Sequence, residues 1–527
     1  MKFNKKLAVA VSGAVLVMAG QVALADSATD IVDALVMKGV LTEEEGRLIT
    51  KGHTSKTSVT PVVKEKDAAF TLESANGNNS ISLTGRMHLD YRHNNLDLYD
   101  TDFNDRDSAT GASNIELRRA RLGVKGKFAK DFNYEIVGNL PGTATIDVAF
   151  VDYAKYPEAK LRLGRFKQPF NLEEQTSSNN IDFMERSYVN QLAPAKKNGA
   201  MFFGEPKTGI TYAVSAYSMN DTELDSRNDK MNYAGRTTLN FGELLGNKTM
   251  VAHIGLSGFD AEYNITPTTT SGNPGTGTTV GQMGTTNGTI LAFRTPGRGL
   301  SNIFAAQIGG VQLSQNLQSA NSNSTSQVKS SAVGLEGAFA FNNIKFQGEY
   351  ARAGFAGQTG TTGDKLDLNA NVFYGEVMYL ATGETYAGAY KGGAFGSIKP
   401  INNFDLDKNQ WGAWEFGLRA EKYEVHDLSI AAGSGGVSQG VGATRVRGTT
   451  SCESNAGGTQ SATLINGCKA SSTTYTAGIK WILNPNAMVK LNYSRTNFGY
   501  TWEHFDLDDS RRMNKEDLLM MRTQFTF

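Results

Sequence analysis

The sequence has few cysteines and prolines and, after its first 25 residues, no long apolar run. Its 527 residues include two cysteines, 11 prolines and 57 glycines. A membrane-spanning helix needs roughly 20 consecutive apolar residues, so this absence excludes a protein that crosses a membrane with helices. It does not exclude a β-barrel, because a barrel strand needs an apolar residue only at every second position. The negative mean hydropathy of -0.34 is compatible with such strands.

An excess of charge of either sign is also lacking. The chain has 52 lysines and arginines against 52 aspartates and glutamates. Residues 1–25 contain three of the lysines and no acidic residue, which leaves 49 against 52 in the remainder. This balance predicts no nucleic-acid binding and no global field that attracts anions. Any ion selectivity must therefore be local.

The residue groups of metal, haem and catalytic sites are absent as well. Cys452 and Cys468 both lie in the Gly/Ser/Thr-rich stretch 431–474, where we expect a loop disulfide in an oxidising compartment. There is no Cys-x-x-Cys-His motif for haem, no second cysteine pair for zinc, and no ligand spacing among the six histidines. No grouping of serine, histidine and acid stands out as a nucleophile with its base. We predict no metal, no cofactor and no enzymatic activity.

The first 25 residues have the features of a cleaved secretory signal. Three lysines precede an apolar run at 7–20, and Ala23-Leu24-Ala25 supplies the small residues that a signal peptidase requires. The alternative is an uncleaved membrane anchor, but the run is short and contains Ser12 and Gly13. We predict export, with residues 1–25 removed.

Residues 26–69 differ from the rest and predict a short periplasmic helical hairpin followed by a linker. Ile31, Leu35 and Val36 fall at helical spacing, Gly39 can end that helix, and Thr42 to Glu45 has the spacing of a capping box. Such a hairpin could self-associate or contact the cell wall, or it could simply pack on itself or on a neighbouring copy. Residues 53–68 have the composition of a linker.

The stretch "SISLTGRMHLDYRH" at 80–93 alternates between apolar and polar residues, which is typical of a β-strand with two different faces. In a soluble sandwich the apolar face would meet a second sheet, and in an outer-membrane barrel it would meet lipid while the polar face lines a lumen. The barrel alternative assigns the residues as follows. Ile81, Leu83, Met87, Leu89 and Tyr91 face lipid, and Ser82, Arg86, His88, Asp90 and Arg92 face the pore.

Further segments of this kind continue to the end of the chain, and we count about sixteen to eighteen strands, within the range of porins. Short turns such as 342–343 and 484–486 suit a periplasmic rim, while long polar stretches at 262–289, 314–330 and 431–474 suit extracellular loops. The amphipathic end "LLMMRTQFTF" indicates a last strand that pairs with the first. We predict an all-β fold: a transmembrane antiparallel barrel of about 16 strands over residues 70–527, in the outer membrane of a Gram-negative bacterium.

Fixed cations line one predicted strand, and a long loop follows another. The alternation at 119–128 directs Arg119, Arg121, Lys125 and Lys127 inward, whereas Arg118 does not fit and would require a bulge. The cations could form a ladder for anions. They could equally pair with lumenal acids in a general pore. The stretch 164–194 could be a loop folded into the lumen or a loop packed at the rim. The candidate acids are Glu116, Glu135, Asp147 and Asp152.

Several blocks, among them "ELRRARLGVKGKF", "LGRFKQPFNLEEQTSSNNIDFMERS", "GAWEFGLRAEKY" and "WILNPNAMVKLNYS", resemble the phosphate-selective porin O and P family in order along residues 80–527. The resemblance implies a sixteen-stranded outer-membrane barrel, usually a homotrimer of separate pores. It also implies that the third extracellular loop folds inward and forms an anion-binding constriction.

The resemblance places the constriction on residues of four motifs. Arg118 and Arg119 belong to "RRAR", Asp147 to "TIDVAF", Ser177 and Ser178 to "TSS", and Arg186 to "MERS". Arg86 is a looser match, and Arg121 joins the set from the strand pattern. The guanidinium groups would neutralise an anion, the serines would donate hydrogen bonds, and the aspartate could accept one from a protonated phosphate oxygen.

The chain departs from phosphate-specific members beside the "TSS" motif. Where those members carry lysines, this chain has Glu174 before the motif and Asn179 after it, which argues against strong phosphate binding. We predict a passive channel for small anions, phosphate among them, with lipid and lipopolysaccharide around it. The alternative is a general porin with weak or cation selectivity. The sequence has no haem-attachment motif for an electron conduit and no nucleophile with its base for a barrel enzyme, and its amphipathic C-terminal strand argues against a soluble β-sandwich adhesin.

Overall fold

The computed structural model describes residues 32, 35–49, 60–66, 69–96, 112–219, 230–265, 289–300, 303–308, 326–359, 365–431, 444–447, 467, 469–506 and 509–527. The predicted signal segment 1–25 lies outside these residues. So do Cys452 and Cys468, and the proposed disulfide therefore stays a prediction.

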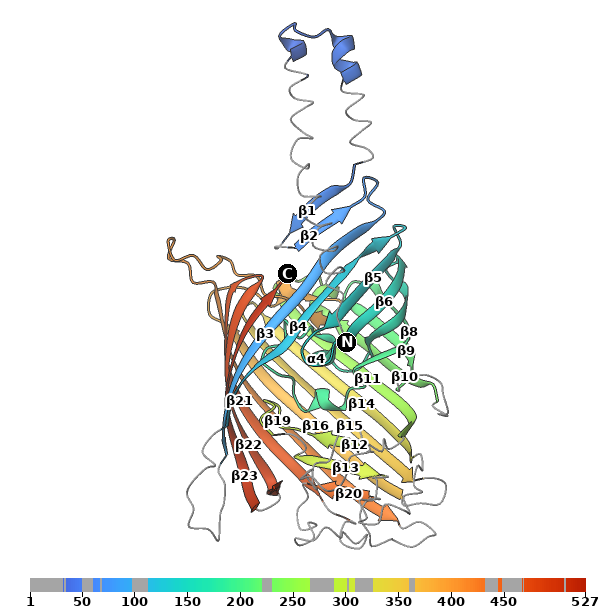
Figure 1. Ribbon diagram of the computed structural model, residues 1–527, viewed down its shortest axis with the longest axis vertical. Coiled ribbons are helices and arrows are strands. Elements are labelled where there is room, and N and C mark those ends of the chain that lie inside the picture. Colours follow the sequence, from blue (N-terminus) through green and yellow to red (C-terminus); the bar gives the residue numbers. More distant parts are fainter. Residues whose placement is uncertain are drawn as a thin grey trace, which may run out of the picture.

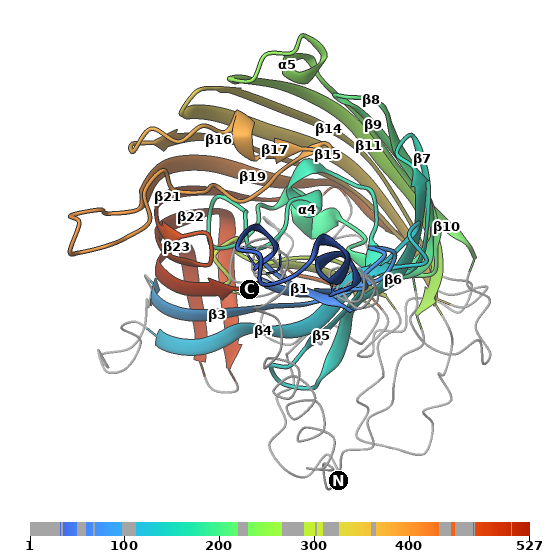
Figure 2. The same cartoon turned by 90° about the horizontal axis from the view of Figure 1, so that it is seen from above.

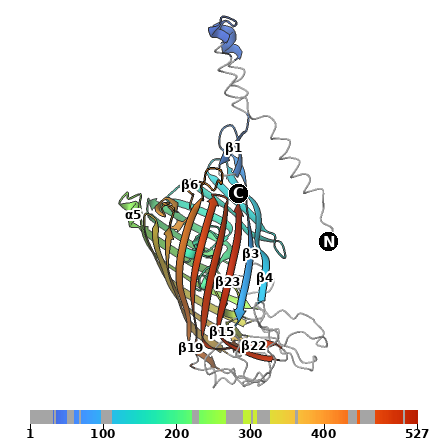
Figure 3. The same ribbon diagram turned by 90° about the vertical axis from the view of Figure 1, so that its left-hand side faces the viewer.

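Sixteen long antiparallel strands, each paired with the next along the chain, form a closed barrel (Figures 1 and 3). The count is at the lower end of the range that the sequence predicted. The strands are β3 (Ser80–Leu96), β4 (Ala112–Phe128), β5 (Phe132–Asn139), β6 (Thr145–Tyr156), β7 (Ala159–Lys167), β8 (Lys196–Lys207), β9 (Ile210–Tyr217), β10 (Asn232–Asn240), β11 (Met250–Ile265), β14 (Ser326–Phe341), β15 (Ile344–Thr359), β16 (Lys365–Leu380), β19 (Ala413–Ala431), β21 (Ala470–Asn484), β22 (Ala487–Asp506) and β23 (Asp509–Thr526).

The last strand closes the barrel on the first, as the amphipathic C-terminus predicted. β23 pairs with β3 from Glu516 opposite Leu96 to Thr526 opposite Arg86. Phe527 then exchanges backbone hydrogen bonds with Gly85, at N···O distances of 2.9 and 3.1 Å. The Phe527 ring packs over this glycine, because a Cβ there would lie 2.3 Å from the end of the ring. Pairing at both edges removes the exposed backbone groups that an open sheet would leave.

The two faces of β3 lie as the alternation predicted. Leu83, Met87 and Leu89 point outward and are 40 to 43% exposed, whereas His88 and Asp90 point into the lumen and are wholly buried. A continuous apolar surface surrounds the barrel because the other strands alternate in the same way. The outward face therefore meets lipid, and the polar face lines the channel.

We expect Leu89→Arg to block barrel assembly, because Leu89 faces lipid farther from the rim, opposite Thr523, and an arginine near the middle of the lipid-facing band costs about 2 to 4 kcal/mol. Lys125→Leu, a change of one charge on the lumenal face of β4, should fold normally. The fraction of each variant that folds into lipid vesicles, followed by circular dichroism, checks this expectation. Equal folding of the two variants would contradict the assignment of faces.

The rims differ in the connections that they carry. The turns at 129–131, 157–158, 208–209, 342–343 and 485–486 are short and lie at one rim, which we assign to the periplasm. Two connections at this rim depart from the expectation of short turns. Residues 241–249, between β10 and β11, contain α5 (Phe241–Leu244). Residues 381–412, between β16 and β19, contain η3 (Ala387–Ala389), β17 (Tyr390–Lys391) and β18 (Ala394–Phe395). Three aromatic residues of 381–412, Tyr386, Tyr390 and Phe395, turn into the barrel and are buried.

A second small sheet lies inside the other end of the barrel. It is made of β12 (Thr289–Phe293), β13 (Phe304–Ile308) and β20 (Thr444–Arg447), which come from the connections between β11 and β14 and between β19 and β21. Phe293 stacks on Tyr423 of the barrel wall with ring centroids 4.3 Å apart. Inward segments from both rims therefore narrow the lumen.

The N-terminal part continues from the periplasmic rim of the barrel, where β2 (Ala69–Glu73) pairs with β3 (Figures 1 and 3). Residues 35–37 and 43–49 are helical, and none of the described helices is long and apolar enough to span a membrane. The capping box is confirmed, since the backbone N–H of Glu45 donates to Thr42 Oγ1 at 3.2 Å and that of Thr42 donates to Glu45 Oε2 at 2.9 Å. Part of the predicted linker is instead strand β1 (Val62–Lys66), which pairs with β2 (Ala69–Glu73). The Lys64–Glu73 ion pair, at 2.9 Å, joins these two strands.

Candidate functional site: a cationic constriction

The loop between β7 and β8, residues 168–195, folds into the lumen, which is the inward arrangement that the family resemblance implied (Figure 2). It contains α4 (Leu172–Gln175) and the 3-10 helix η2 (Val189–Leu192). Phe170, Leu172, Phe183 and Tyr188 are at most 1% exposed and pack against the wall and the other inward segments. The alternative, a loop packed at the rim, is therefore wrong.

Carboxylates of the opposite wall hold this loop by its backbone. Glu349 of β15 accepts hydrogen bonds from the N–H groups of Leu172 and Glu173, at 2.9 and 2.8 Å. Glu421 of β19 accepts one from Tyr188 at 2.8 Å. The loop is thereby fastened to β15 and β19, and it faces the strands β3 to β8 across the remaining space.

We expect Glu349→Leu to loosen the loop and raise the single-channel conductance. The change leaves two buried N–H groups without their acceptor, at a cost of about 1 to 3 kcal/mol for each. Glu349→Gln keeps an acceptor oxygen and should have a smaller effect. Glu424→Leu, on the outer face of β19, is the control. An unchanged conductance in a folded Glu349→Leu protein would contradict this role of the loop.

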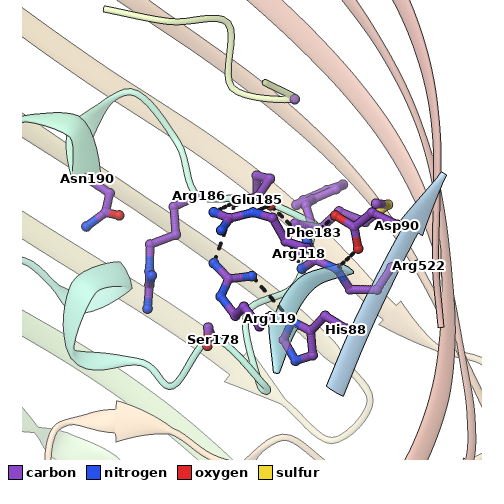
Figure 4. Close-up of polar contacts among 12 residues, drawn as sticks. His88, Asp90, Arg118, Arg119, Ser178, Phe183, Glu185, Arg186, Asn190 and Arg522 are labelled. Carbon is purple, nitrogen blue, oxygen red and sulfur yellow. Dashed lines mark hydrogen bonds and ion pairs between the residues drawn. The ribbon is translucent and has the colours of Figure 1, made fainter. Parts of the chain in front are cut away.

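Arg118 and Arg119 both reach the lumen because β4 carries a bulge. His88 of β3 lies opposite Arg119 and Leu89 opposite Leu117, so Arg118 is the extra residue. The sequence pattern suggested such a bulge but did not require the two arginines to share a face. In the structure both contact Glu185 of the inward loop (Figure 4). The bulge thus directs two adjacent guanidinium groups to one carboxylate.

Glu185 is surrounded by guanidinium groups. Arg118 donates to it through Nε and Nη2 at 2.9 and 3.2 Å, and Arg119 Nη2 lies 3.7 Å away. Arg522 Nη2 donates at 2.8 Å and Arg92 Nη2 at 3.2 Å. A carboxylate of the protein therefore occupies the place between Arg118 and Arg119 where the family resemblance would put a bound anion.

Arg522 and Asp90 form the support of this cluster. Both are completely buried and joined by two hydrogen bonds, at 2.6 and 2.7 Å, in the parallel arrangement that suits a guanidinium and a carboxylate (Figure 4). Arg522 also donates to the carbonyl of Met184. Since β3 and β23 are the closing strands, the same contacts tie the loop to the closure of the barrel.

A cavity of about 750 Å³ lies between the loop and strands β3 to β8. Of the residues predicted to bind anions, all except Arg118 line it. Its charged lining comprises nine basic and three acidic side chains. These are Arg86, Arg119, Arg121, Arg162, Arg165, Lys167, Arg186, Lys196 and Lys197, and Glu135, Asp147 and Glu174.

The predicted site residues in this cavity differ in the hydrogen bonds and ion pairs that they already form with other groups of the protein. Asp147 bridges Arg121, at 2.8 Å, and Lys196. Arg186 donates to the carbonyls of Glu173 and Thr176, at 2.9 and 2.8 Å, and so braces the loop. Arg86 Nη1 donates to Ser178 Oγ at 2.9 Å, and within the described part of the chain it forms no ion pair. Arg86 is therefore the guanidinium best placed to bind a solute.

The two departures from the family pattern have identifiable contacts. Glu174 Oε2 accepts from Asn190 at 2.6 Å and lies 3.8 Å from Arg186 Nε. Burial raises the pKa of Glu174, but Arg186 and Lys167 lower it more, so the pKa lies below its usual value and the group is ionised at neutral pH. Asn179 Oδ1 lies 3.2 Å from His88 Nε2. Glu174 thus subtracts one charge from the cavity, as the sequence suggested.

A closed barrel with an apolar outer surface, a charged lumen and an inward loop is the architecture of an outer-membrane porin. In the described part of the chain, no group of three or more His, Cys, Asp or Glu side chains could hold a metal ion. The chain belongs to the phosphate-selective porin O and P family, whose model matches residues 81–291 and 297–527. It is a channel protein of the Gram-negative outer membrane.

The individual relatives have low sequence identity to this chain. Porin O of Pseudomonas aeruginosa is 26% identical over 372 residues, which are 67% of this chain and 74% of the relative. The anion-selective porin from Comamonas acidovorans has 10% identity and a TM-score of 0.44, over 85% of this chain and 100% of that one. The outer-membrane channel DcaP of Acinetobacter baumannii has 10% identity and a TM-score of 0.43, over 85% and 98% of the two chains.

Proposed function

We propose that the protein forms a water-filled channel for the passive diffusion of small anions, inorganic phosphate among them. We assign the anion-binding site to Arg86, Arg121, Arg186, Ser177 and Ser178, with Arg119 behind them. The observation that carries this proposal is the excess of nine basic over three acidic side chains around one lumenal cavity.

The chemistry of passage follows from this lining. An anion that enters the constriction loses part of its hydration, and guanidinium and hydroxyl donors replace it. Arg86 supplies a charge that forms no ion pair in the described part of the chain, and Ser178 supplies a neutral donor beside it. The neighbouring cations prevent any one of them from holding the anion permanently, because each also attracts it toward the next position.

Asp147 has a separate role in this proposal. It holds Arg121 and Lys196 in place and neutralises part of their charge. It can also accept a hydrogen bond from a protonated phosphate oxygen, which a fully ionised competitor cannot offer. The site therefore favours partly protonated phosphate over more highly charged anions.

Single-channel chloride currents titrated with phosphate test the proposal. We expect phosphate to enter the site and reduce the chloride current in a saturable way. A chloride current that phosphate leaves unchanged, in a channel that prefers cations, would contradict both the site and the solute class.

We further propose that the channel is a homotrimer embedded in outer-membrane lipid and lipopolysaccharide, with residues 26–69 in the periplasm. Family membership supports the trimer. The position of β1 and β2 beside β3, at the rim with short turns, supports the periplasmic placement. Light scattering of the detergent-purified protein tests the oligomer: a mass of three chains is expected, and a mass of one chain would contradict it.

A further inference from the structure

The cavity beside Arg86 has an apolar end as well as a cationic one. Val148 and Phe150 of β6 and Met201 of β8 line it together with Val137 of β5, which lies directly opposite Val148. Phe166 at the end of β7 completes this apolar surface. Such a surface does not contribute to the binding of inorganic phosphate, because phosphate has no apolar area to bury.

Arg162 belongs to the apolar end rather than to the anion site. Its guanidinium lies 3.7 Å from the centroid of the Phe150 ring. Both oxygens of Asp152 accept from it, at 2.6 and 2.8 Å. Its charge is therefore neutralised, and its planar group covers one face of the Phe150 ring and presents its own flat surface there. The cavity thus offers one strong anion-binding end and one flat, largely apolar end.

The size and charge of the cavity narrow the class of ligand. Its 750 Å³ falls within the roughly 300 to 1,000 Å³ of pockets for organic molecules. Its apolar surface contributes to binding only for a ligand that has apolar area to bury, and Arg86 with Ser178 offers one position for a carboxylate. An organic anion with one carboxylate and an apolar body therefore uses both ends of the cavity.

We propose, on the basis of the proposed anion-channel function, that this cavity is a binding site for organic monocarboxylates with an aromatic body. The carboxylate binds Arg86 and Ser178, and the body packs on Val148, Phe150 and Met201. The apolar surface therefore sets the preference among anions that the cationic end admits.

Acetate and phenylacetate test the proposal, because both are monocarboxylates and only the second carries a ring. Each is titrated against the chloride current of the full-length protein in planar bilayers. We expect phenylacetate to block at a concentration at least about 10-fold lower than acetate, since even one methylene in an apolar pocket is worth about 10-fold or more. Equal blocking by the two in an anion-selective channel would overturn the inference alone. A channel that neither anion blocks and that prefers cations would overturn the proposed function as well.

Two variants of the apolar end separate binding there from partitioning into the bilayer. Val148→Thr and Met201→Gln keep the approximate side-chain size and add polarity. Each should reduce the preference for phenylacetate about 10-fold while leaving the block by acetate unchanged. Val251→Thr, buried on β11 elsewhere in the barrel, is the matched control and should leave the preference intact. A preference for phenylacetate that survives in both cavity variants would overturn the site.

Discussion

Replacing Arg86 with glutamine is expected to raise the phosphate concentration for half-block of the chloride current about 10- to 100-fold. A hydrogen bond to a charged group contributes about 1.5 to 3 kcal/mol, and each 1.4 kcal/mol is tenfold in affinity. Arg86 has the largest expected effect because it forms no ion pair in the described part of the chain, whereas Arg121 is paired with Asp147. Glutamine preserves a donor toward Ser178, so the loop should stay in place.

Arg495→Gln is the matched control for this experiment. Arg495 lies on the outer face of β22, is paired with Asp517 at 2.7 and 2.8 Å, and does not reach the lumen. The same loss of charge there should leave phosphate block unchanged. A similar weakening in both variants would mean that the total charge of the protein, and not the cavity, sets the affinity.

Replacing Glu185 with glutamine should have the opposite effect and tighten phosphate block about 10-fold or more. The carboxylate neutralises Arg118, Arg119, Arg92 and Arg522 together. Removing one partner of a buried ion pair costs about 3 to 5 kcal/mol, because the remaining charges are left uncompensated. A phosphate ion that takes the place of the carboxylate recovers part of this free energy. Phosphate should therefore also raise the melting temperature of Glu185→Gln more than that of the natural protein.

Glu116→Gln distinguishes this effect from a general change of charge. Glu116 pairs with Arg92 in the same cluster, but it is 36% exposed and has no contact with Arg118 or Arg119 among its ion pairs in the described chain. We expect only a small change in phosphate block for that variant. If the Glu185→Gln variant bound phosphate no more tightly than the Glu116→Gln variant, the carboxylate of Glu185 would not compete with phosphate.

The barrel could be predicted from the sequence because its signals are local. The alternation of apolar and polar residues along a strand decides which of its faces is apolar, and the two faces of β3 followed directly from this pattern. The capping box at Thr42 was likewise visible in four consecutive residues. Arg118 breaks the alternation of its strand, and this break is visible in neighbouring residues. The side of the sheet to which the bulge directs Arg118 could not be predicted from them.

The contacts that define the constriction are not local. Glu349 lies 177 positions from Leu172, and Arg522 lies 432 positions from Asp90. No periodicity connects such residues, so the sequence could not show that Glu185 would lie between Arg118 and Arg119. The basic residue Lys196, which shares Asp147 with Arg121, was missed for the same reason.

The inward turn of residues 381–412 was missed for a different reason. A long connection at the periplasmic rim contradicts the usual pattern of short turns there. Tyr386 and Tyr390 find buried partners in Glu415, at 2.7 Å, and His253, at 2.6 Å, which lie on two different strands of the wall. Only the closed barrel brings these partners together.

Anion selectivity of the natural protein is measured by its reversal potential in a planar bilayer with a potassium chloride gradient. We expect a potential of the sign that chloride permeation sets, which added phosphate shifts, because the nine cations of the cavity outweigh Glu135, Asp147 and Glu174. A potential of the sign that potassium permeation sets, unaffected by phosphate, would mean that the carboxylates of the lumen dominate and that the channel does not select anions.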